Sequence, residues 1–200
     1  MSRPSWLLSR QFSRDERLKA SKGKDDPIYF MDGVHPQHNS VAAYGWIKRG
    51  TNKDLESNTG RARVNINAAI DIDHLGIVVD FAESVNAQST LTVLQTLESK
   101  HPKAKKIYVY CDNARYYRCS LVQEFVKQSK IELLFLPPYS PNLNLIERLW
   151  KYFRKQLLYN KYYAHFADFV AACGHFFEHI KGHREALRTL LTEKFQLIGA

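Results

Sequence analysis

Three carboxylates stand where they could do chemistry together. Asp32 and Asp112 each end an apolar run, and Glu147 lies near the start of a helical pattern. Acids at two strand ends and at one helix start can converge on a single point. Three converging carboxylates in a basic chain predict a divalent-metal site that acts on phosphate. Polynucleotide strand chemistry is therefore the leading hypothesis.

Each acid also has a purely structural interpretation. An Asp at a strand end, such as Asp32 or Asp112, often serves only to form a turn. Glu147 could close a capping box with Asn144 as the helix N-cap, or form an ion pair with Lys151 one turn later. Three further acids near strand ends compete for the site: Asp71, Asp73 and Asp80.

The charge balance points to a polyanionic partner. Lys and Arg number 29 against 20 Asp and Glu, so the formal net charge is +9 and the pI is about 9.4. Such a pI is typical of nucleic-acid binders, although basic proteins with other roles are common. We expect DNA to contact basic side chains close to the acids, namely Arg115, Arg118, Arg148, Lys151, Arg154 and Lys155.

The cysteine spacing and the lengths of the apolar runs indicate the cellular compartment. Cys111, Cys119 and Cys173 contain no CxxC pair, which disfavours a zinc ribbon or a disulfide framework and fits the cytoplasm. His35 and His38 share a loop without a Cys partner, a weak zinc signal. No apolar run approaches the roughly 18 residues needed to span a membrane, and the N-terminus lacks a signal-peptide core. We expect a cytoplasmic protein with no membrane partner.

The acids require a sheet and a helix to position them. Residues 1–26 form a basic lead-in, poorly ordered or a short helix. Alternating apolar residues and turn signals predict early strands at 27–32, 44–48, 63–71 and 75–81. Later strands are expected at 106–111 and 131–136, and helices at 87–100, 120–129, 144–158, 166–179 and 183–193. This order predicts an α/β fold with a mixed sheet flanked by helices, over a domain at 27–180 followed by a C-terminal helix in 181–200.

Two blocks resemble the catalytic domain of bacterial insertion-sequence transposases of the mariner-type DDE superfamily. They are YVYCDNA at 108–114 and LFLPPYSPNLNLIERLW at 134–150. The 34 residues between Asp112 and Glu147 (113–146) are similar to that family's interval between its second Asp and its Glu. The segment 32–50 is similar to the block around the first Asp. The resemblance covers residues 25–180.

The resemblance implies an RNase H-like fold, with Asp32 on the first strand, Asp112 at the end of the fourth strand and Glu147 on the following helix. It implies that these three residues are catalytic and hold two Mg²⁺ or Mn²⁺ ions. Asp32 is expected to bridge both ions, and Asp112 and Glu147 to hold one each. The implied reaction is phosphodiester hydrolysis followed by strand transfer in DNA transposition.

Two departures from the family keep alternatives open. Family members carry helix-turn-helix domains before the first Asp, whereas 31 residues precede Asp32 here. Tyr117 stands where the family often has His. One alternative is an RNase H-like nuclease that does not transpose. The other is a truncated copy that binds DNA, or binds a full-length transposase, and regulates it. Expected partners are therefore DNA and either a second copy or a full-length transposase.

Overall fold

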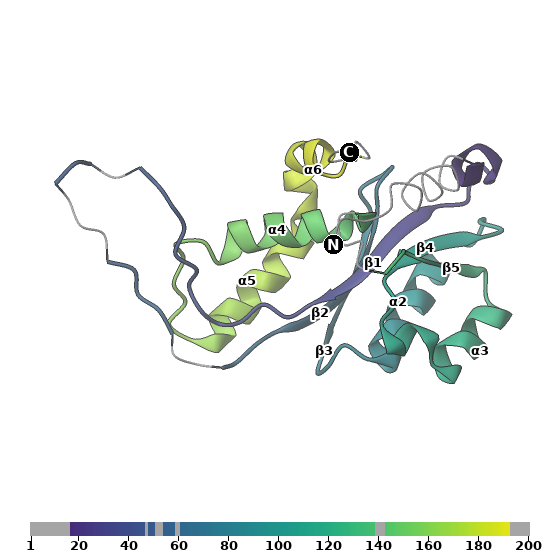
Figure 1. Cartoon of the computed structure of the whole chain (residues 1–200), viewed down its shortest axis with the longest axis horizontal. Helices are drawn as coiled ribbons and strands as arrows, with labels where there is room; N and C mark the ends of the chain where they lie inside the picture. The colour runs from purple at the N-terminus through teal and green to yellow at the C-terminus, as the bar shows by residue number, and fades with distance from the viewer. Residues whose placement is uncertain (1–16, 47, 51–53, 59–60, 139–142, 193–200) are drawn as a thin grey trace.

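A five-stranded mixed sheet organises the chain (Figure 1). The computed structural model describes residues 17–46, 48–50, 54–58, 61–138 and 143–192. The strands lie in the order β3-β2-β1-β4-β5. They are β1 (Ile28–Val34), β2 (Asn65–Asp71), β3 (Ile77–Ala82), β4 (Ile107–Cys111) and β5 (Ile131–Phe135). The first strand of the chain is thus the central strand of the sheet.

β1 has a different kind of neighbour on each side. It pairs antiparallel with β2, where Asp32 lies opposite Ala68, and β2 continues antiparallel to β3. It pairs parallel with β4, where Phe30 lies opposite Tyr110, and β4 continues parallel to β5. The parallel connections run through α2 (Ala87–Lys100) and α3 (Ser120–Gln128). Parallel strands need such crossovers.

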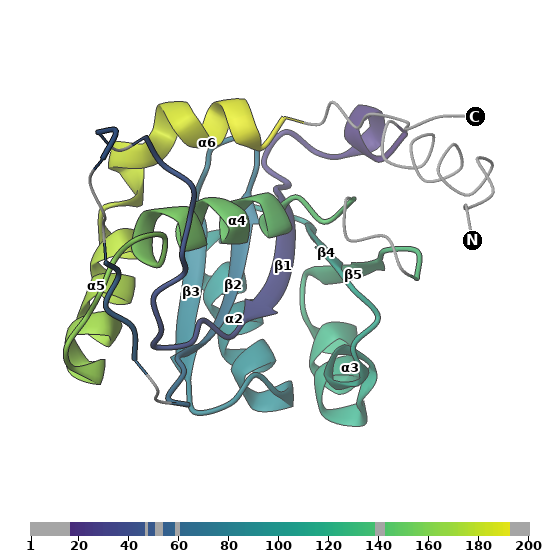
Figure 2. The ribbon, with the colours of Figure 1, turned by 60° about the vertical axis from the view of Figure 1, so that its left-hand side comes forward.

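Helices cover both faces of the sheet (Figure 2), and each face has its own apolar core. Ile28 and Phe30 of β1 belong to the core beneath α4 (Ile146–Leu157) and α5 (Phe166–Glu178). Tyr29 and Met31 belong to the core with α2 and α3. Successive strand side chains point to opposite faces, so Asp32 follows Phe30 onto the α4 face.

The sequence of α4 explains where it packs. Its buried residues recur at helical spacing and form one apolar stripe: Ile146, Leu149, Trp150, Phe153 and Leu157. After α5, the chain continues through the 3₁₀ turn η3 (Ile180–His183) into α6 (Arg184–Leu190). Leu187 and Leu191 pack into the same core. The C-terminal elements therefore cover the face of the sheet that carries Asp32.

Most of the predicted elements are confirmed with small shifts in their ends. The helix predicted at 183–193 is shorter, because α6 ends at Leu190 and residues 193–200 lie outside the described part. In the lead-in, residues 17–21 are helical, and 1–16 lie outside the described part. The predicted strand at 44–48 is wrong, since residues 44–46 and 48 form no strand.

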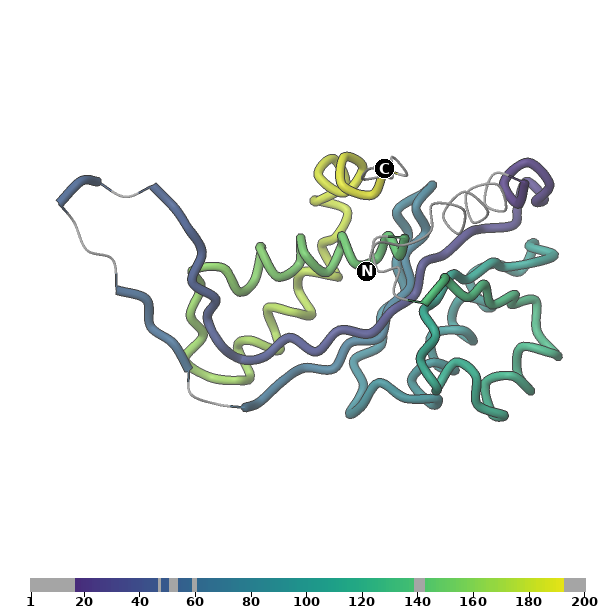
Figure 3. Tube along the Cα trace, viewed as in Figure 1, coloured from purple at the N-terminus to yellow at the C-terminus, as the bar shows by residue number. Residues whose placement is uncertain are grey.

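The residues wrongly predicted as a strand belong to an arm that leaves the body of the protein after β1 (Figure 3). The structure describes residues 44–46, 48–50 and 54–58 of this arm. Its base is fixed to the end of α4, where Val41 N donates to Leu158 O (2.9 Å) and Ala43 N donates to Asn160 Oδ1 (2.9 Å). Beyond this point Tyr44 and Trp46 are fully exposed, at 109% and 104%. The alternating aromatic residues imitate a strand, but none of the described strands pairs with them.

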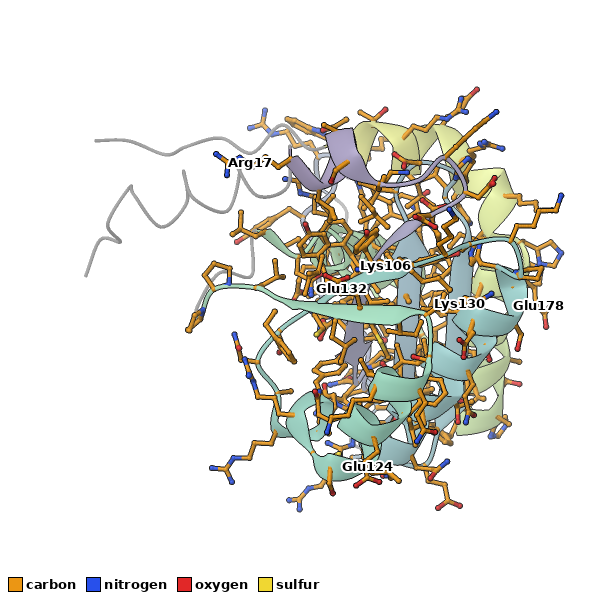
Figure 4. The ribbon with its side chains drawn as sticks, turned by 90° about the vertical axis from the view of Figure 1, so that its right-hand side faces the viewer. Arg17, Lys106, Glu124, Lys130, Glu132 and Glu178 are labelled. Carbon is orange, nitrogen blue, oxygen red and sulfur yellow. The ribbon has the colours of Figure 1, made fainter. Side chains whose placement is uncertain are left out.

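The β4–β5 edge carries an exposed ion pair near the beginning of these strands. Lys106 Nζ lies 2.7 Å from Glu132 Oε2, and Figure 4 shows the two side chains together. Hydrogen bonding to Glu132 raises the pKa of the Lys106 ammonium. Asp112 lies beyond the other end of β4, so this ion pair is separated from it by the length of the strand.

Candidate active site

The sheet brings Asp32 and Asp112 to the same edge and the same face. Asp32 lies within β1, two residues before Val34, and not at the strand end as expected. Asp112 directly follows β4. Phe30 of β1 pairs with Tyr110 of β4. Asp32 comes two residues after Phe30, and Asp112 comes two residues after Tyr110. Alternation therefore directs both toward the face covered by α4.

Glu147 reaches this face from the first turn of α4 and is half-buried. The capping box considered for Asn144 and Glu147 does not form, because the N-cap is Leu145 and makes no side-chain capping bond. The Asn144 side chain is buried, and its Nδ2 donates to Met31 O (3.3 Å), whereas its Oδ1 has no hydrogen-bond partner among the described residues. Among the described ion pairs, none joins Glu147 to Lys151. Neither structural role suggested for Glu147 is realised in the described residues.

Like charge and burial act strongly on Asp32. Its pKa is raised to about 7, first by burial and next by the negative charge of Glu147, with a smaller contribution from Asp112. Hydrogen bonds from the main chain of Gly33 and from the indole of Trp150 act in the opposite direction. Both other acids thus repel the charged form of Asp32, and a cation placed beside it would relieve the repulsion.

Trp150 is a site residue that the sequence pattern did not reveal. Its indole Nε1 donates to Asp32 Oδ2 at 3.1 Å, across 118 positions of the chain. Helical spacing had placed Trp150 on the apolar stripe of α4, which is confirmed by its 1% exposure. The only available signal was its chemistry, because a buried indole N–H normally finds an acceptor.

The loop after β4 holds Asp112 through short polar contacts. Ala114 N donates to Asp112 Oδ1 at 2.9 Å, which forms an Asx turn. Asn113 Nδ2 donates to Leu136 O at 2.6 Å and ties the end of β4 to the end of β5. Arg118 in turn donates to Asn113 Oδ1. These hydrogen bonds fix the loop. Asp112 itself is exposed, and its second carboxylate oxygen lies outside the Asx turn.

The three carboxylates are neighbours without closing into a ready-made metal cage. In the described part of the chain, no group of three or more His, Cys, Asp or Glu side chains comes close enough to hold a metal ion. The donors on offer are all carboxylate oxygens, the type that Mg²⁺ and Mn²⁺ prefer. The arrangement can attract a hard divalent cation, although in the described conformation the three carboxylates do not together enclose one.

The competing acids and histidines have other partners. Asp71 is buried at the C-terminal end of β2, where its Oδ2 lies 2.9 Å from His74 Nδ1, and its partner across the sheet is Tyr29 and not Asp32. Asp80 lies within β3 near the sheet edge, and burial raises its pKa. His35 Nδ1 lies 2.8 Å from Asn65 Oδ1, and His38 Nε2 lies 2.8 Å from Tyr163 O. These contacts give both histidines structural partners.

The six predicted DNA-contacting residues fall into two groups. Four are exposed without a described salt bridge: Arg115, Lys151, Arg154 and Lys155. Arg118 lies over the Phe135 ring at 3.9 Å, besides its bond to Asn113. Arg148 donates to Leu190 O at 3.1 Å and to Thr192 O. The second group therefore has structural work in the fold, whereas the first is available to a partner.

Sequence comparison identifies the family. Residues 27–170 match the protein family described as DDE superfamily endonuclease. The chain belongs to this family. The DDE chain is 25% identical over 155 residues to the insertion element IS630 uncharacterized 39 kDa protein of Shigella sonnei, covering 72% of this chain and 44% of that protein. It is also 42% identical over 43 residues to the uncharacterized protein y4pE/y4sA of Sinorhizobium fredii (strain NBRC 101917 / NGR234), covering 22% and 32%.

Solved structures show the same fold. The Mos1 mariner paired end complex with Mn superposes with a TM-score of 0.64 at 16% identity, covering 96% of the DDE chain and 62% of that chain. The catalytic domain of Mos1 mariner transposase gives 0.62 at 15% identity, covering 96% and 91%. The predicted RNase H-like mixed sheet flanked by helices is thereby confirmed. The DDE chain spans less than half the length of the two curated relatives.

The described helices are too short or too polar to cross a bilayer.

Proposed function

We propose that this chain performs metal-dependent DNA cleavage and strand transfer in transposition, with Asp32, Asp112 and Glu147 as its catalytic and metal-holding residues. One observation carries the proposal: adjacent parallel strands bring two acids to the face where α4 offers the third. Membership of the DDE superfamily endonuclease family supports it. So does the likeness to a mariner transposase whose complex was solved with Mn.

The residues fit Mg²⁺ or Mn²⁺, and we propose two ions. The donor set consists of hard carboxylate oxygens, without the thiolates that favour softer metals. The raised pKa of Asp32, caused by burial and then by Glu147, indicates negative charge that a cation would offset. Glu147 and Asp112 both act electrostatically on Asp32, which supports our proposal that Asp32 would be shared by both ions. Asp112 and Glu147 would each complete one side.

Phosphodiester chemistry could proceed here without a protein nucleophile. Bound divalent ions would supply activation of the attacking hydroxyl and neutralisation of charge on the phosphate. The residues of this chain would orient the reactants: Trp150 fixes one oxygen of Asp32, and the Asx turn at Ala114 fixes one oxygen of Asp112. Partial burial of Asp32 would strengthen electrostatic interactions between its carboxylate and a bound cation.

DNA would be held mainly through its phosphates. Lys151, Arg154 and Lys155 recur at one-turn spacing after Glu147 on α4, so they extend the basic surface away from the acids. Arg115 adds a cation directly after the Asp112 loop. Arg118 and Arg148 contribute less under this proposal, because their guanidinium groups already bind protein atoms. Contacts of this kind position the duplex and do not read its sequence.

Cleavage of a plasmid or oligonucleotide in Mg²⁺ or Mn²⁺ tests the proposal. Asp32→Asn, Asp112→Asn and Glu147→Gln should each reduce cleavage by about 100-fold or more, because even residues behind the metal ligands cost 10–100-fold. Asp54→Asn is the matched control, since Asp54 is an exposed arm residue. Full activity in all three site variants would refute the assignment.

A strand-transfer assay with a defined transposon end separates the rival functions. Joined products support transposition, and cleavage without joining supports an RNase H-like nuclease. DNA binding without either reaction supports a regulatory copy.

A second copy or a full-length transposase is the proposed protein partner, and sedimentation with and without DNA tests it. Cys111, Cys119 and Cys173 are free thiols, which supports a reducing cytoplasmic setting.

A further inference from the structure

One buried side chain links the helix that carries Glu147 to the strand that carries Asp32. The Trp150 indole is 1% exposed, and its Nε1 donates to Asp32 Oδ2 at 3.1 Å. Glu147 and Trp150 are separated by three positions on α4, so they lie on adjoining parts of the same helical surface. A single turn of helix thus supplies one carboxylate and a hydrogen bond to another.

The indole ring is held rigidly in place. Phe153 packs edge-on against it, with ring centroids 6.2 Å apart and planes at 80°. Phe177 of α5 does the same at 6.4 Å and 81°. Edge-to-face contacts of this kind are favourable beyond the area they bury. The ring therefore cannot turn its N–H away from Asp32 without disrupting the aromatic core.

The chemistry of indole suits an orienting role. Its Nε1–H is a donor only, so it can neither take the proton of Asp32 nor ligate a cation. An ionised carboxylate has about four lone-pair sites, and one hydrogen bond leaves the others available. A donor fixed at Oδ2 selects one orientation of the carboxyl plane. It does so without competing for the remaining sites.

We propose that Trp150 is a positioning residue, whose indole N–H orients the Asp32 carboxylate so that it can share a divalent cation with Asp112 and Glu147. The inference rests on the proposed metal-dependent function. Groups that orient metal ligands from behind alter metal affinity by about 10–100-fold when removed. Trp150 links α4 to β1 in this role, and the same helix also sets the position of Glu147.

Mn²⁺ binding to the full chain without DNA provides the test, with free Mn²⁺ measured by electron paramagnetic resonance. Trp150→Phe removes the N–H and keeps an aromatic ring, and it should weaken Mn²⁺ affinity by about tenfold. Phe169→Leu is the matched control, because Phe169 is a fully buried aromatic residue of the same core whose described ring contacts do not include Trp150. It should change the affinity less than twofold.

The indole N–H also gives a signal that does not depend on a Trp150 variant folding. The chain has three tryptophans, Trp6, Trp46 and Trp150, and Trp6→Phe with Trp46→Phe isolates the Trp150 indole in a ¹H–¹⁵N spectrum. Adding Mg²⁺ should shift this resonance, and Asp32→Asn should abolish the shift. This measurement uses the native Trp150 contact.

The outcomes are distinguishable. Wild-type Mn²⁺ affinity in a folded Trp150→Phe protein, or an indole resonance that ignores Mg²⁺ while the protein binds it, would overturn the role of Trp150 alone. Failure of the wild-type chain to bind Mn²⁺ at all would overturn the proposed function and this inference with it. Weakened binding in Trp150→Phe, together with an unaffected Phe169→Leu control, would establish the positioning role.

Discussion

Arg148 binds the main chain of Thr192, so the residue after Glu147 is fastened to the segment that follows α6. The same guanidinium donates to Leu190 O, the last residue of α6. A cationic side chain at a helix C-terminus satisfies carbonyls that have no partner within the helix. The basic residue nearest to Glu147 therefore supports the fold at the site.

Arg148→Met should lower the melting temperature and change DNA affinity little. Hydrogen bonds to a charged group contribute about 1.5–3 kcal/mol when buried, and partial exposure of Arg148 reduces this to about 1 kcal/mol. For a chain of this size, that corresponds to about 2–4 °C. Lys151→Met on the same helix should leave the melting temperature unchanged. Differential scanning fluorimetry compares them, and an unchanged Arg148→Met protein would contradict the prediction.

Neutralising the exposed stripe on α4 should weaken DNA binding and its salt dependence. Replacing Lys151, Arg154 and Lys155 with Gln should reduce the salt slope by about 2–3, given about 0.9 per lost phosphate contact. Fluorescence anisotropy with a duplex of arbitrary sequence between about 50 and 200 mM salt measures this. A triple replacement elsewhere serves as the control, at the exposed residues Lys103, Lys105 and Lys127. Equal losses in both triples would mean that only net charge matters.

Without metal, stability should fall as pH rises toward neutrality. The pKa of Asp32 is about 7 in the folded protein and about 4 in an unfolded chain. Between these values the folded state binds more protons than the unfolded state, so the free energy of unfolding decreases as pH increases. Asp32→Asn should remove this decrease and exceed wild type in stability at pH 8. Denaturant titrations in EDTA from pH 4 to 8 measure it, with Asp54→Asn as the control.

Mg²⁺ or Mn²⁺ should reverse that loss of stability. A ligand that binds only the folded state adds about 2.7 kcal/mol at a hundred times its dissociation constant. The rise in melting temperature should be clear in wild type and Asp54→Asn, and much smaller in Asp112→Asn. An equal rise in all three proteins would place the cation away from Asp112.

Some of the site could be predicted because local pattern and chemistry agree there. The apolar run of β4 made a buried strand, and Asp112 had to emerge from its end. The apolar stripe of buried residues on α4 determined which side of the helix faces the core, and Glu147 lies beside that apolar stripe. The family resemblance supplied the pairing of these acids with Asp32. Strand alternation then accounts for the face they share.

Other features were out of reach because they depend on partners distant in the chain. The Trp150 bond to Asp32 joins α4 to β1, and no periodicity records which acceptor a buried donor meets. Asn144 matched a capping signal, but its amide binds the β1 carbonyl of Met31. In the arm at Tyr44, the alternating pattern predicted a strand that does not form. An alternating pattern alone does not make a strand, and none of the described strands pairs with this one.

The central place of β1 has a consequence for biosynthesis. β1 is made first, yet Phe30 must meet Tyr110, a residue 80 positions later, before the two halves of the sheet join. Closing so long a loop costs entropy before any contact repays it, which makes such pairings slow. A chain emerging from the ribosome with only β1 to β3 exposed carries one of the three carboxylates. The proposed capacity to cut DNA therefore arises only when nearly all of the domain has been synthesised and folded.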